Sequence, residues 1–91
     1  MPTLPKETEM SYTPGPWHAG GLIIADSDAQ VIAYCVPQNI EAGMESEDLS
    51  NANLIAAAPD LLEAILMLMR NDENAIESAQ KAIAKAEGRT L

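Results

Sequence analysis

The chain has 91 residues, of which 47% are hydrophobic, and a formal net charge of −9 at pH 7. This length allows one small domain, the apolar content excludes a disordered chain, and the acidic excess disfavours direct binding to nucleic acid or an anionic membrane. A single cysteine excludes an internal disulfide, and the chain shows no leader and no run long enough to span a bilayer, so we expect a cytoplasmic protein.

The amino-terminal end is rich in proline and polar side chains. We expect residues 1–11 to form a flexible arm and residues 12–91 to form a single α+β domain. The prolines of residues 12–18 favour an extended path into that domain. Trp17 is the only large anchor there. It either packs over a sheet or offers a stacking platform for a ligand ring, with His18 at its edge.

Residues 21–36 predict an antiparallel β-hairpin. Two runs rich in β-branched residues, 21–26 and 30–36, flank a short turn that contains two aspartates. Two strands are marginal in water, so helices or a second subunit must cover them. The turn lacks the glycine and the distal glutamate of a calcium loop, and Cys35 has no partner at metal spacing, so no metal is expected.

Three helices are predicted after an acidic loop. They cover residues 49–58, 59–70 and 73–87. Pro59 suits the first turn of a helix and therefore marks a restart of the helical path. Gly88 suits the position just after a helix and therefore marks the end of the last one.

The second predicted helix is apolar around most of its circumference. Between Leu61 and Met69 the only polar side chain is Glu63. Such a helix must be buried on most sides, and a chain of 91 residues can hardly bury it alone. The third helix carries a narrow, close-packing seam of Ile76, Ala79, Ile83 and Ala86. We therefore expect the last two helices to form an antiparallel hairpin and the chain to form a homo-oligomer.

No constellation of residues for catalysis is present. The chain has one histidine and one cysteine, and no glycine-rich loop precedes a helix to hold a phosphate. We predict no catalytic residues, no cofactor and no enzyme activity, which favours a binding protein. Asn53 and Arg70 stand out because apolar sequence surrounds them. Their ordinary roles would be a hydrogen bond at a helix start and a solvated helix end.

Two blocks carry a resemblance to known proteins. Thr13-Pro-Gly-Pro-Trp17 precedes the predicted hairpin, and Asn51-Ala-Asn-Leu-Ile-Ala-Ala-Ala-Pro-Asp-Leu-Leu-Glu-Ala64 spans the helix restart. Over about residues 12–88 the chain resembles a group of small phage and prophage accessory proteins. Its layout also resembles the phage anti-Thoeris sponge family, whose members have an antiparallel sheet and two carboxy-terminal helices.

The resemblance implies a function without chemistry. Sponge proteins assemble as homo-oligomers and trap cyclic ADP-ribose-type signals, or in some members cyclic oligonucleotides, so that a bacterial defence effector is not activated. The ligand would lie between subunits. Arg70 would offer a planar fork to a phosphate, and Asn53 would recognise a ribose or base edge. Because residues 38–48 contain no aromatic side chain, stacking would fall to Trp17 or Tyr34.

The residues leave two other classes of function open. The acidic surface suits a protein-binding inhibitor, such as a DNA mimic that blocks a defence or DNA-processing complex. A structural oligomer without a ligand is the third class. A pocket at a subunit interface that is lined by Arg70 favours the sponge, whereas a continuous carboxylate face favours the inhibitor.

Overall fold

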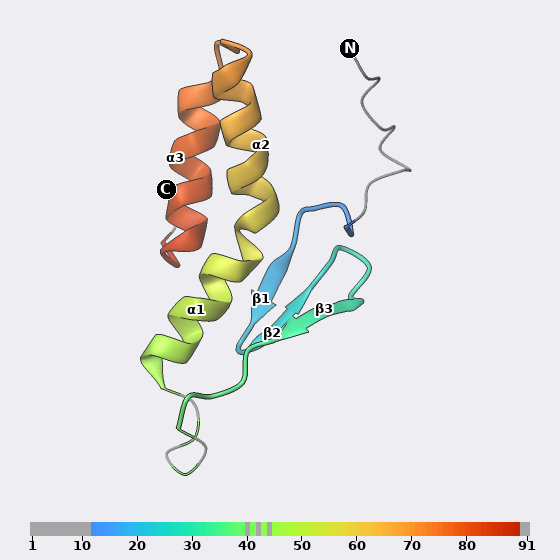
Figure 1. Ribbon diagram of the computed structural model, residues 1–91, viewed down its shortest axis with the longest axis vertical. Helices are drawn as coiled ribbons and strands as arrows, with labels where there is room; N and C mark the ends of the chain where they lie inside the picture. The colour runs from blue at the N-terminus through green and yellow to red at the C-terminus, as the bar shows by residue number, and fades with distance from the viewer. Residues whose placement is uncertain (1–11, 40, 42, 44, 90–91) are drawn as a thin grey trace.

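Three short strands precede three helices along the chain (Figure 1). The computed structural model describes residues 12–39, 41, 43 and 45–89. The elements are β1 (His18–Gly20), β2 (Ile23–Ala25), β3 (Val31–Tyr34), α1 (Ser46–Ala56), α2 (Ala58–Met69) and α3 (Ala75–Ala86). The α+β class is confirmed, while the arm expected for residues 1–11 lies outside the described residues.

The sheet is antiparallel with the order β1-β2-β3. Strands β2 and β3 are the predicted hairpin. Their turn is closed by the Asp26 carboxylate, which accepts the backbone N–H groups of Asp28 and Gln30, both at 2.9 Å. Strand β1 was not predicted. Its three residues carry no strand signal of their own, and they pair with β2 through a turn in which Gly21 has a φ of 63°.

The hydrophobic core lies between the sheet and α1. Ile24 of β2 is fully buried against Ala52 and Ala56 of α1, and Trp17 and Ile32 are among the partly buried side chains that pack against this cluster. Ile24 and Asp48 are the largest fully buried side chains in the part of the chain that the structure describes. The core is therefore small and built mainly from alanine.

Helix α1 begins at Ser46, three residues earlier than predicted, because a buried carboxylate completes its first turn. The Asp48 side chain accepts the backbone N–H of Glu45 at 3.0 Å and that of Gln38 at 3.2 Å. These two part-buried bonds tie the preceding loop to the helix start. The helical path then breaks at Ala57, and Pro59 is already inside the first turn of α2.

Among the described residues, no single helix is both long and apolar enough to cross a membrane. Helices α1 and α2 reach the required length and apolar content only when taken together, and they are bent by 46° at their junction.

Helices α2 and α3 form the predicted antiparallel hairpin (Figure 1). A left-handed residue follows each of them, Asn71 with a φ of 57° and Gly88 with a φ of 73°. Beyond each, a backbone N–H reaches back into the last turn: Asp72 to the carbonyl of Met67 at 3.0 Å, and Arg89 to that of Ala84 at 2.7 Å. Gly88 therefore ends its helix as predicted, through a Schellman motif.

The contact between the two hairpin helices uses alanine rather than isoleucine. On α3 the buried residues are Ala75, Ala82 and Ala84, whereas Ile76 is 62% exposed and Ile83 is 47% exposed. The two isoleucines of the predicted seam are thus exposed, whereas its alanines, Ala79 and Ala86, are partly buried. Alanine permits a closer approach of the two helix backbones, and the larger isoleucines lie on a neighbouring face of α3. Helix α2 likewise buries only Ala64.

Candidate functional site

A groove of about 570 Å³ lies between the proline-rich residues 12–17, which we call the entry segment, and one side of α2. Its lining from the entry segment is Tyr12, Pro14, Gly15 and Pro16, and its lining from α2 and the following residue is Pro59, Asp60, Leu62, Glu63, Leu66 and Arg70. A volume of this order is typical of small-molecule sites. The mixture of rigid apolar walls with a few charged groups is typical of such sites as well.

The groove exists because two distant blocks of sequence meet. Gly15 lies so close to α2 that an added Cβ would be 2.6 Å from the Cβ of Pro59. The indole N–H of Trp17 donates to the carbonyl of Thr13 at 3.1 Å, and the Gly15–Pro16 peptide bond is cis. The conformation of the entry segment is therefore fixed both by its own hydrogen bond and by its contact with Pro59.

Substitution of Gly15 tests this close approach. Gly15→Ala should lower the free energy of unfolding by about 1–3 kcal/mol, because a methyl group must displace a rigid proline ring. Gly20→Ala is the matched control, since an added Cβ there meets nothing within 4 Å. Urea denaturation followed by circular dichroism measures both. Equal stability of the two variants would contradict the contact between the entry segment and α2.

Arg70 is the cation of this groove that is available to a ligand. The ion pairs within the described part of the chain join Lys81 to Glu77, Lys85 to Asp60 and Arg89 to Glu87, and none involves Arg70. Arg70 follows directly after α2 and is exposed. Its guanidinium therefore has no carboxylate partner of its own among those residues, although Glu63 lines the same groove.

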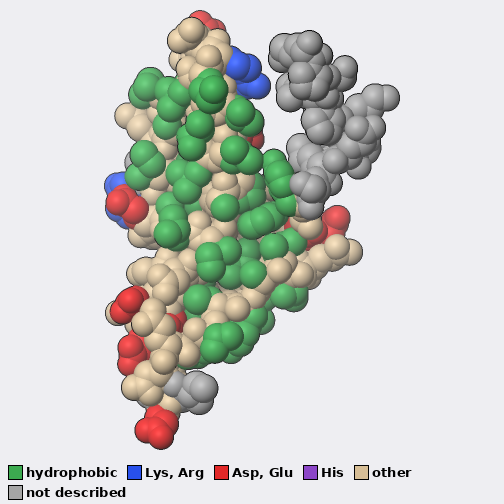
Figure 2. Space-filling model, in the orientation of Figure 1, with side chains coloured by type: hydrophobic (Ala, Val, Ile, Leu, Met, Phe, Trp, Pro, Cys, Tyr) green, Lys and Arg blue, Asp and Glu red, His purple; other side chains and the backbone are tan. Residues whose placement is uncertain are grey.

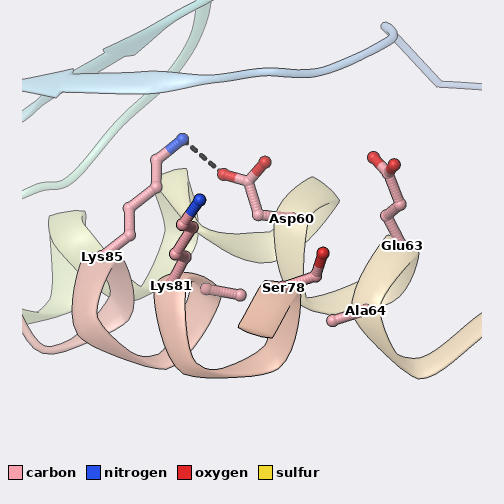
Figure 3. A pocket seen from close by; sticks show the side chains of 7 residues that line it. Asp60, Glu63, Ala64, Ser78, Lys81 and Lys85 are labelled. Carbon is pink, nitrogen blue, oxygen red and sulfur yellow. Dashed lines mark hydrogen bonds and ion pairs between the residues drawn. The ribbon is translucent and has the colours of Figure 1, made fainter. Parts of the chain in front are cut away.

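A second, smaller hollow of about 310 Å³ lies between α2 and α3 (Figure 3). An ion pair spans it, with Lys85 Nζ 2.5 Å from an Asp60 carboxylate oxygen, and both side chains are about one-third exposed at 28% and 32%. Lys81, on the same side of α3, is paired with Glu77 at 3.1 Å. Since both lysines are already paired, this hollow serves the packing of the hairpin better than it serves an anionic ligand.

The residues singled out in the sequence do not gather at one place within the protomer. Arg70 lines the groove, and His18 lines a separate, open hollow of about 530 Å³ beside the sheet. Tyr34 is 58% exposed on β3. Asn53, on α1, lies beside Gly88, where a Cβ would be 2.8 Å from its Nδ2. Trp17 is partly buried against the core.

Tyr12 is the aromatic residue of the groove, and sequence reasoning missed it. Stacking was assigned to Trp17 or Tyr34, neither of which lines this groove. The signal available was its position next to the prolines, which fix the path of the entry segment. In the part of the chain that the structure describes, no group of three or more His, Cys, Asp or Glu side chains is arranged to hold a metal ion.

A family model described as Salmonella phage P22 protein Y8K6 matches residues 3–90 of the chain. No curated protein and no solved structure matches it.

Proposed function

The chain belongs to the family of Salmonella phage P22 protein Y8K6, and from this premise we propose that it is a phage anti-defence protein that sequesters a cyclic nucleotide signal. The ligand would be of the cyclic ADP-ribose type or a cyclic oligonucleotide. The protein would hold it without changing it, in the cytoplasm of the infected or lysogenic host. A bacterial defence effector would then be deprived of its activator.

The groove that joins Tyr12 to Arg70 is the observation that supports this proposal. An aromatic face and proline walls suit a base or another flat ring, and a guanidinium suits a phosphate through two parallel hydrogen bonds. Among the residues that the structure describes, the groove lining contains no histidine, cysteine or serine that could act as a nucleophile or a base in the usual hydrolytic pairs. This combination favours binding over chemistry.

The charge of the groove limits the ligand further. Asp60 is paired with Lys85 at 2.5 Å, which leaves Glu63 and Arg70 as the unpaired charges among the described residues of the lining. One guanidinium beside one carboxylate suits a ligand with few phosphates better than a long polyanion. A cyclic ADP-ribose-type compound or a cyclic dinucleotide meets that limit.

Substitution of Arg70 tests the proposal. Calorimetry measures the binding of cyclic ADP-ribose isomers and cyclic dinucleotides to each variant. Arg70→Ala should weaken binding about tenfold to over a hundredfold, because a hydrogen bond to a charged group contributes about 1.5–3 kcal/mol. Arg89→Ala is the matched control, since that arginine follows α3 and is paired with Glu87. Glu63→Gln should strengthen binding several-fold, because it removes a like charge from beside the phosphate.

These variants separate the outcomes. Equal losses in Arg70→Ala and Arg89→Ala would indicate a general charge effect and would contradict the groove as the site. Weaker binding in Glu63→Gln would indicate that the ligand is not anionic. If the unaltered protein binds none of these compounds, the proposed sponge function is wrong.

The acidic inhibitor is the alternative in that case. Glu45 and Glu47 are exposed at the start of α1, and acidic side chains gather at that end of the molecule (Figure 2). Such a surface suits a basic groove on a partner protein. Glu45→Gln with Glu47→Gln would then weaken that partner's binding, whereas Arg70→Ala would not.

A further inference from the structure

One face of the α2–α3 hairpin is apolar and is not covered by the residues that the structure describes. Figure 2 shows hydrophobic side chains across both helices on the viewed face. We call it the hairpin face. Its large exposed side chains are Ile65 (53%), Leu68 (43%) and Met69 (76%) of α2, with Ile76 (62%) and Ile83 (47%) of α3.

Helix geometry places these side chains together. Successive residues of an α-helix are about 100° apart around its axis. On α2 the buried Ala64 faces α3, so Glu63 and Ile65 lie on opposite flanks of it. On α3 the buried Ala82 likewise separates Lys81 from Ile83.

The hollow in Figure 3 shows which flank of α2 and which flank of α3 lie on the same side of the hairpin. Glu63 and Lys81 both line that hollow, on one side of the hairpin. Ile65 and Ile83 therefore share the other side. Ile76 lies two turns before Ile83 and belongs to the same row.

We propose that a second copy of this chain occupies the hairpin face. The first reason is the small core. Ile24 is the only large apolar side chain among the fully buried residues that the structure describes, and the rest of the buried core is mainly alanine. Burial of the hairpin face against another molecule would add apolar contact that this small core lacks. Every molecule of the protein exposes this face and needs a partner for it. A second copy of the chain is present wherever the first copy is made.

The second reason is charge. Each copy carries a formal charge of −9, so two copies repel unless their contact surfaces carry no charge. Asp60, Glu63, Lys81 and Lys85 line the hollow on the other flank of the hairpin, and Glu87, one turn after Ile83, is paired with Arg89. The hairpin face is thus a place where two such acidic molecules can meet.

The third reason is shape. The row on α3 alternates large and small residues, Ile76, Ala79, Ile83 and Ala86, whereas the row on α2 is uniformly large. Large side chains of α2 fit the gaps at the alanines of α3 of the second copy, and a two-fold axis repeats that contact. The groove lies on the adjoining side of α2, lined by Leu62, Leu66 and Arg70, and Leu62 is two helical turns from Met69 of the hairpin face.

Sedimentation of the unaltered protein between about 1 and 100 μM tests the dimer. The expected mass is twice the 9.7 kDa of the chain. The melting temperature should also rise with protein concentration, because dissociation and unfolding are linked in such a dimer. A mass of 9.7 kDa throughout, with a melting temperature independent of concentration, would overturn the proposal.

Ile83→Glu tests the face. A buried unpaired carboxylate should raise the dissociation constant of the dimer more than about 100-fold. Val36→Glu is the control, because it adds the same charge at an apolar side chain that is 64% exposed and lies outside α2 and α3. A dimer that survives Ile83→Glu unchanged would contradict the face.

If Ile83→Glu does not fold, Ile83→Ala replaces it. That variant should weaken the dimer at least about tenfold, since it leaves an unfilled gap in the interface. An unchanged dissociation constant would overturn the assignment of the face. Neither measurement involves a ligand, so a negative result would contradict the dimer without contradicting the proposed function.

Discussion

Trp17→Ala is expected to lower the free energy of unfolding by about 2–4 kcal/mol. Trp17 packs against the cluster of Ile24, Ala52 and Ala56, and its indole N–H donates to Thr13 at 3.1 Å. In a core this small no neighbouring side chain can fill the volume of an indole. A domain of this length has a free energy of unfolding of about 5–14 kcal/mol, so the variant should lose a large share of its stability. Circular dichroism in a urea series measures the loss.

Two other aromatic substitutions serve as controls for Trp17. Trp17→Phe keeps most of the packing and loses the bond to Thr13, so its loss should be about 1–2 kcal/mol. Tyr34→Ala removes a ring that is 58% exposed on β3 and should change stability by less than about 1 kcal/mol. If Trp17→Ala stays fully stable but loses ligand binding, the indole is a stacking platform, which is the other interpretation of the sequence.

Asp48→Ala is expected to have a comparable effect, about 2–4 kcal/mol. Its carboxylate is 1% exposed and accepts two backbone N–H groups, those of Glu45 at 3.0 Å and Gln38 at 3.2 Å. Alanine would leave both donors without their acceptor and would remove the Asp48 half of the capping box that Glu45 and Asp48 form at the start of α1. The start of α1 should then fray, which hydrogen exchange at the amides of residues 45–49 would detect as lost protection.

The neighbouring carboxylate provides the control. Glu47 is exposed, and its contact is the side-chain amide of Gln38 at 3.2 Å, so Glu47→Ala should cost less than about 0.5 kcal/mol. Asp48→Asn keeps one acceptor oxygen and should lie between Asp48→Ala and the unaltered protein. Equal stabilities of Glu47→Ala and Asp48→Ala would contradict the capping role of Asp48.

The parts of the fold that sequence predicts are those with local causes. Asp26 closes the hairpin turn with its own carboxylate, and Gly88 ends α3 because its φ of 73° suits glycine. By contrast, β1 depends on its pairing with β2, and the start of α1 depends on Gln38, ten residues before Asp48. Such contacts leave no periodic signal in the residues that make them.

The candidate site was only partly predictable for the same reason. Arg70 was found because it is a charged residue beside an apolar run. Tyr12 was missed because it reaches the groove only when Gly15 comes to rest against Pro59, and that approach joins segments more than 40 residues apart. The exposure of Ile76 and Ile83 was missed because helical spacing defines a row of residues without saying which neighbour it faces.

The most direct test of the central claim is to identify what the protein retains. The unaltered protein is incubated with cyclic ADP-ribose isomers and cyclic dinucleotides, freed of excess compound, denatured by heat, and the released material is analysed by mass spectrometry. Binding without chemistry predicts that one compound is retained in a fixed ratio to protein and released unchanged, and that Arg70→Ala retains much less. Retention of none of these compounds, or release of a hydrolysed product, would contradict the account.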